Sequence, residues 1–94
     1  MKYVVINNAE DGRHVSMYAT RHAAAKYVDE IIGRVAAREL GQPYYSDWGQ
    51  RLVIEERPDH WTVRLEKQVR AAYDARECGT ASKFQTALLE GLGW

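Results

Sequence analysis

One segment, Arg21–Leu40, limits what this chain can fold into, because it is the longest stretch with a single clear period. Thr20 precedes it as a typical N-cap, and Gly41 follows it as a typical helix stop. The sequence therefore predicts one helix over 21–40, about 30 Å long. The apolar side chains that recur along one stripe of this helix are Ala24, Val28, Ile31 and Val35. A stripe of that length needs a surface to cover it.

Short β-rich runs on both sides of the helix predict that surface. Lys2–Asn7 is apolar on both faces, and Arg13–Ala19 alternates apolar and polar side chains, so the two runs predict a β-hairpin. Arg51–Glu56 predicts a third strand. We expect these strands to form an antiparallel sheet whose inner face packs on the helix. The side chains expected on that face are Val5, Val15, Met17, Leu52 and Ile54.

The run Trp61–Glu66 fits two structures. As a strand, it alternates apolar and polar side chains cleanly. As a helix, it would begin after Asp59 and share an apolar stripe with Val69 and Tyr73. Because the alternation is the cleaner pattern and Trp, Thr and Val favour strands, we favour a second hairpin, and the helix stays open as the alternative.

The rest of the chain predicts two helices and completes the fold class. A helix follows over Lys67–Glu77, and a last short helix, Ala81–Glu90, would be capped by Thr80, with Phe84 and Leu88 facing the core. The order of elements predicts an α+β fold, an antiparallel sheet with helices on one face, arranged as ββα–ββα plus a short C-terminal helix. Matching residues in the two ββα segments suggest an internal repeat, although any two such segments share much of this pattern.

Length and charge exclude several classes of protein. The 94 residues predict one domain over 1–94. Thirteen basic residues balance thirteen acidic ones, so no overall field attracts nucleic acid or membrane, and the weak mutual repulsion leaves a homodimer open. The N-terminal apolar run is too short for a signal peptide or membrane span, and the single cysteine excludes an intrachain disulfide. We therefore expect a cytoplasmic protein that does not bind membranes.

No pattern of residues marks an enzyme, a metal centre or a cofactor site. His14, His22 and His60 do not have the spacing of metal ligands. Cys78 precedes a predicted helix start, where a thiol can become reactive, but no motif supplies a base or an oxyanion site. We expect a non-catalytic protein without cofactors.

The loop Gly41–Gln50 is the strongest candidate for a contact with a partner. It is longer than most connections and carries three large aromatic residues, Tyr44, Tyr45 and Trp48. Tyr and Trp are the residues that most often anchor protein interfaces. We expect Trp48 to lie mainly in the core and Tyr44 or Tyr45 to make the contact.

Arginine residues suggest an alternative partner. Arg34 and Arg38 lie one turn apart on the predicted helix, with Lys26 on the same side, as in a stripe that contacts phosphates. Glu30 stands four residues before Arg34, however, and such pairs are common on solvated helix faces. Nucleic-acid binding is therefore the alternative function, with Arg34 and Arg38 as candidate contacts.

In size and layout the chain resembles the small phage-encoded inhibitors of bacterial defence, the anti-CRISPR proteins among them. The resemblance lies in a compact α/β chain of this length with a strand–strand–helix opening over Lys2–Arg34. These inhibitors share no motif, so the resemblance assigns no residue a role. It implies a stoichiometric inhibitor that binds a subunit of a defence complex in the host cytoplasm.

Overall fold

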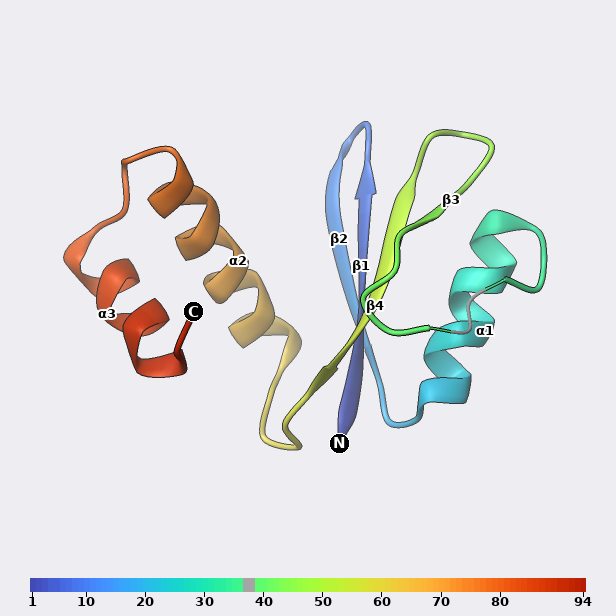
Figure 1. The fold of residues 1–94 in the computed structure, drawn as a ribbon, viewed down its shortest axis with the longest axis horizontal. Coiled ribbons are helices and arrows are strands. Elements are labelled where there is room, and N and C mark those ends of the chain that lie inside the picture. Colours follow the sequence, from blue (N-terminus) through green and yellow to red (C-terminus); the bar gives the residue numbers. More distant parts are fainter. Residues whose placement is uncertain (37–38) are drawn as a thin grey trace. The chain divides into compact units, whose positions relative to one another are not determined.

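The fold is α+β, as predicted, with four antiparallel strands and three helices in the computed structural model, which describes residues 1–36 and 39–94 (Figure 1). The described residues group into two compact units, Met1–Val63 and Arg64–Trp94. The prediction of one domain stays a prediction. The elements in chain order are β1 (Lys2–Ala9), β2 (Gly12–Tyr18), α1 (Arg21–Ile32), β3 (Tyr44–Tyr45), β4 (Arg51–Arg57), α2 (Val63–Glu77) and α3 (Lys83–Leu92).

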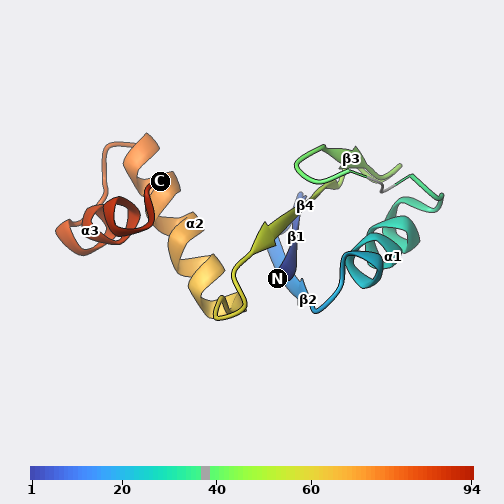
Figure 2. The same ribbon diagram turned by 60° about the horizontal axis from the view of Figure 1, so that its bottom comes forward.

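The first unit is one sheet in the strand order β2–β1–β4–β3, with α1 on one face (Figure 2). β1 is paired along its length on both sides, so that Val5 lies opposite Ser16 of β2 and opposite Ile54 of β4. The β1–β2 turn closes at the pair Ala9 and Gly12, and Gly12 has a φ of 133°. A glycine is required there because residues with a side chain rarely adopt this φ.

The core of the first unit lies between α1 and the sheet. Its buried side chains are Val5, Ala24, Val28, Ile32, Leu52 and Ile54. The rings of Tyr18 and Tyr27 pack at its edge with centroids 5.6 Å apart. Burial raises the pKa of the Tyr18 phenol above its ordinary value.

The expected inner face was wrong in β2. The two-residue turn fixes a register in which Val15 lies opposite Ile6 and Met17 opposite Val4. Because Ile6 and Val4 alternate with Val5 along β1, Val15 and Met17 lie on the sheet face away from α1. Tyr18 takes the α1 side instead.

The prediction of one helix over 21–40 was also wrong, because α1 ends at Ile32. Thr20 caps the helix as predicted, with its Oγ1 accepting a hydrogen bond from the Ala23 N–H at 3.1 Å. Gly33 has a φ of 76°, and its N–H donates to the Asp29 carbonyl at 2.9 Å, which turns the chain out of the helix. Val35, expected on the buried stripe, is 70% exposed.

The favoured strand over 61–66 was wrong, and the helical alternative holds from Val63 onward. β4 pairs with β1 along its whole length and with β3 only at Arg51 and Leu52, and the residues after Pro58 add no further strand to the sheet. The chain turns instead, with the Trp61 N–H donating to the Pro58 carbonyl at 3.0 Å. Trp61 is buried, and the Arg57 guanidinium lies 5.9 Å from the centre of its ring.

The second unit contains α2 and α3. The predicted cap of the last helix was wrong, because α3 is capped by Ser82 and buries Leu89. The core assignment of Phe84 was also wrong, since it is 71% exposed, whereas Leu88 is half-buried. The Ser82 side chain accepts from the Gln85 N–H, and the Gln85 side chain accepts from the Ser82 N–H, which is a capping box.

None of the helices among the described residues combines the length and the apolar character that crossing a bilayer requires.

Trp94 joins the two helices of the second unit. Its ring meets Tyr73 edge to face at 6.4 Å, and the Arg70 guanidinium lies 5.3 Å from its ring centre. Its carbonyl accepts from Arg76 at 2.7 Å, and its N–H donates to the Leu89 carbonyl at 2.9 Å. One residue therefore binds α2 through its ring and carbonyl, and α3 through its amide.

Trp94→Ala is expected to destabilise the second unit by about 1–3 kcal/mol, because it removes the ring contacts with Tyr73 and Arg70. Amide hydrogen exchange of α3 should speed up while exchange in β1 stays unchanged. The matched control is Gln68→Ala, which truncates an exposed side chain of α2 in the same unit and should leave α3 exchange as it is. Equal protection of α3 in the wild type and Trp94→Ala would contradict this role for Trp94.

Candidate protein-binding surface

A short loop with dense hydrogen bonding joins β3 to β4. The Ser46 N–H donates to the Gln50 carbonyl at 2.9 Å, and the Gln50 N–H donates to the Ser46 hydroxyl at 3.0 Å. The Gly49 N–H donates to the Ser46 carbonyl at 3.1 Å, and Gly49 has a φ of 81°. Ser46 itself is buried. These bonds fix the backbone of the loop, because the polar groups at both ends of the turn bind each other.

The fixed loop presents aromatic side chains to solvent. Trp48 lies between the two bonded ends of the turn and is 89% exposed, and Tyr45 at the end of β3 is 55% exposed. We call Tyr45–Gln50 the aromatic turn. An exposed indole on an ordered backbone loses little conformational freedom when it binds, which is the property of an interface anchor.

The roles of the aromatic residues differ from those expected. The expectation that Trp48 packs in the core is wrong, because almost all of its side chain is exposed. Tyr44 has the structural role, since its ring packs against the core and its hydroxyl accepts from the Glu39 N–H at 3.0 Å. The pairing of β3 explains why the two tyrosines differ in burial. Tyr44 pairs with the buried Leu52, whereas Tyr45 pairs with the exposed Arg51.

The arginine stripe does not form on α1. Arg34 follows Gly33 in the bend after the helix and is exposed. It lines an open, shallow depression together with Lys26 and Glu30, where charges of both signs meet. Arg38 lies outside the described residues. Because the helix ends before Arg34, the repeat of basic residues that a phosphate-binding helix face needs is absent from α1 itself.

The histidines and the cysteine do not come together. His14 lies 3.2 Å from Asp11, and His22, His60 and Cys78 are all exposed. Among the residues that the structure describes, no three His, Cys, Asp or Glu side chains gather in a group that could hold a metal ion.

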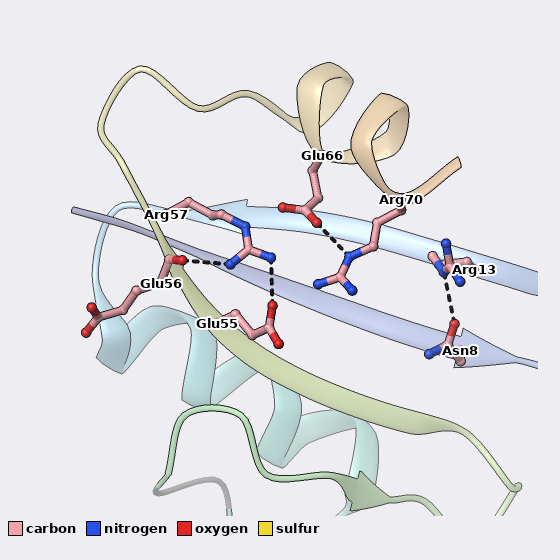
Figure 3. Close-up of polar contacts among 7 residues, drawn as sticks. All are labelled: Asn8, Arg13, Glu55, Glu56, Arg57, Glu66 and Arg70. Carbon is pink, nitrogen blue, oxygen red and sulfur yellow. Dashed lines mark hydrogen bonds and ion pairs between the residues drawn. The ribbon is translucent and has the colours of Figure 1, made fainter. Parts of the chain in front are cut away.

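Each unit contains an ion pair between residues that are close in the sequence (Figure 3). In the first unit, Arg57 binds the Glu55 carboxylate at 2.6 Å and the Glu56 carbonyl at 2.8 Å. In the second, the buried Glu66 accepts from Arg70 at 2.9 Å, one turn along α2. Each carboxylate is held by an arginine, which is the arrangement of a structural ion pair.

Comparison of the chain with protein-family models, with curated proteins and with solved structures finds no match. Sequence reasoning assigned two exposed aromatic residues, Trp48 and Phe84, to the core. The S-x-x-Q pattern at Ser82–Gln85 was a usable signal, because a capping box places the start of the helix at that serine.

Proposed function

We propose that this chain is a non-catalytic protein-binding module that docks on its partner through the aromatic turn. The observation that carries the proposal is Trp48, which is 89% exposed on a turn held by hydrogen bonds among Ser46, Gly49 and Gln50. A side chain that only supported the fold would pack against it. Trp48 is instead held away from the core by an ordered backbone.

The chemistry of the turn favours a protein partner. Trp and Tyr bury large areas with few rotatable bonds, and they are the residues most enriched at the centres of protein interfaces. Because the loop backbone is already hydrogen-bonded, a partner gains the indole contact without ordering the loop first. The neighbouring charges, Asp47 and Arg51, have opposite signs and are exposed, which suits the polar rim of such an interface.

The partner class belongs to the same proposal. The resemblance to phage-encoded inhibitors supports a subunit of a bacterial defence complex as the partner. The test expresses the chain in bacteria with an active CRISPR system and counts plaques of a targeted phage. Wild-type chain should raise plaque numbers by orders of magnitude, and Trp48→Ala should not. Unchanged plaque numbers across CRISPR types would reject this partner class while leaving the aromatic turn to be tested separately.

The experiment on the binding mode uses immobilised chain and a bacterial lysate, with nuclease treatment and a salt series. A protein that is captured by wild type, lost with Trp48→Ala and retained at high salt supports the proposal. A nucleic-acid binder behaves differently, because its affinity falls steeply as salt displaces phosphate contacts. Capture of nucleic acid that disappears with salt and persists in Trp48→Ala would favour the alternative function instead.

A further inference from the structure

One face of α3 is exposed and apolar at its centre. Phe84 is 71% exposed, and Ala87 and Gly91, three and seven residues further on, are exposed on the same side of the helix. Leu89 occupies the opposite, buried side. The phenylalanine ring projects from this face, and the two small residues allow another helix to approach closely.

The only charged side chains of α3, Lys83 and Glu90, flank this row on one side, and both are exposed. They are seven residues apart, which is two helical turns, so they lie on the same flank of the helix. In two antiparallel helices, equivalent flanks face each other. Lys83 of one copy then lies opposite Glu90 of a second copy, and the reverse pair forms by symmetry.

The same arrangement matches shapes as well as charges. A two-fold axis near Ala87 places Phe84 of one copy opposite Gly91 of the other, so that each ring meets the residue with no side chain. Ala87 lies at the crossing point, where a small residue lets the helices approach. Charge and shape therefore select the same antiparallel register.

We propose that α3 is a self-association surface through which two copies of this chain form an antiparallel, two-fold symmetric dimer. This contact is independent of the aromatic turn. One pair of ten-residue helices buries less than a standard interface of about 1,600 Å². We therefore expect a weak dimer, with a dissociation constant on the order of 100 μM.

Sedimentation equilibrium of the full chain, from about 10 μM to about 1 mM, tests the proposal over the range in which such a dimer would form. Wild type should shift from monomer to dimer. Lys83→Glu and Glu90→Lys should each weaken the dimer by on the order of ten-fold, because each variant places two pairs of like charges across the axis. The double variant, with the charges exchanged, should recover wild-type association.

A mixture of the two single variants gives the sharpest test. Lys83→Glu carries two acidic residues on this flank and Glu90→Lys carries two basic ones, so the mixture should form a heterodimer more tightly than either variant associates alone. Phe84→Ala should abolish the dimer, and circular dichroism should show that the chain stays folded because this ring is exposed. Trp48→Ala is the control and should dimerise as wild type does.

A wild-type chain that stays monomeric throughout this range would overturn the proposal. So would a dimer that Phe84→Ala leaves intact, or charge variants that the double exchange fails to rescue. Loss of dimerisation in Trp48→Ala would place the contact at the aromatic turn instead. A failure of the proposed partner binding leaves all of these outcomes unchanged.

Discussion

Val28→Ala is expected to lower the free energy of unfolding of the first unit by about 2–3 kcal/mol. Val28 is fully buried between α1 and the sheet. The substitution removes two carbon groups, each worth about 0.8 kcal/mol of burial, and leaves a cavity that adds to the loss. Urea denaturation followed by circular dichroism measures the change.

Val35→Ala is the matched control for Val28→Ala. The two valines are seven residues apart and would share one stripe if α1 continued to Leu40. Because α1 ends at Ile32 and Val35 is 70% exposed, its truncation should change stability by less than about 0.5 kcal/mol. Equal losses from both substitutions would mean that residue 35 is buried and that the helix end at Gly33 is wrong.

Trp48→Ala is expected to weaken binding of the partner by about 30-fold or more, which is the loss of an interface anchor worth about 2 kcal/mol. Thermal melting should be the same as in wild type, because the indole contacts solvent on almost its whole surface. Tyr45→Ala should give a smaller loss of affinity, since Tyr45 is only about half exposed. Titration calorimetry with the captured partner measures both.

Tyr44→Ala is the control for these two variants and should behave in the opposite way. It removes a ring that packs on the core and a hydroxyl that binds the Glu39 N–H, so it should lower the melting temperature. Any loss of affinity should follow the lost stability. If Trp48→Ala binds as wild type does while Tyr44→Ala alone loses binding at full stability, the anchor has been assigned to the wrong residue.

The sequence was sufficient for the parts of the fold that local patterns determine. The hairpin of β1 and β2, the Thr20 cap and the strand β4 each depend on residues close together in the chain. The end of α1 was missed because Ala37 and the residues after Gly33 continue the helical composition, and composition does not report the φ of one glycine. The inner face of β2 was missed because it depends on the turn register.

The site was only partly predictable for a related reason. The aromatic content of 41–50 identified the loop that carries the exposed aromatic residues. Hydrophobicity alone, however, predicted that Trp48, the largest of these side chains, is buried in the core. Its exposure follows from the hydrogen bonds between Ser46 and Gln50, which hold the turn in a conformation that places the indole in solvent. The strand assigned to 61–66 was wrong because alternation over six residues did not distinguish a strand from the first turn of α2, which begins at Val63.

The central place of β1 also determines the order in which the first unit can form. β1 and β2 are neighbours in sequence and can pair early, but β4 comes from the far end of the unit. Val5 cannot reach Leu52 and Ile54 until the intervening helix and loop have closed. Pairing between distant segments slows folding, because the entropy of loop closure is lost before any contact forms. During synthesis, the hairpin therefore leaves the ribosome with the β4-facing edge of β1 still open, and this edge stays available to other chains until β4 arrives.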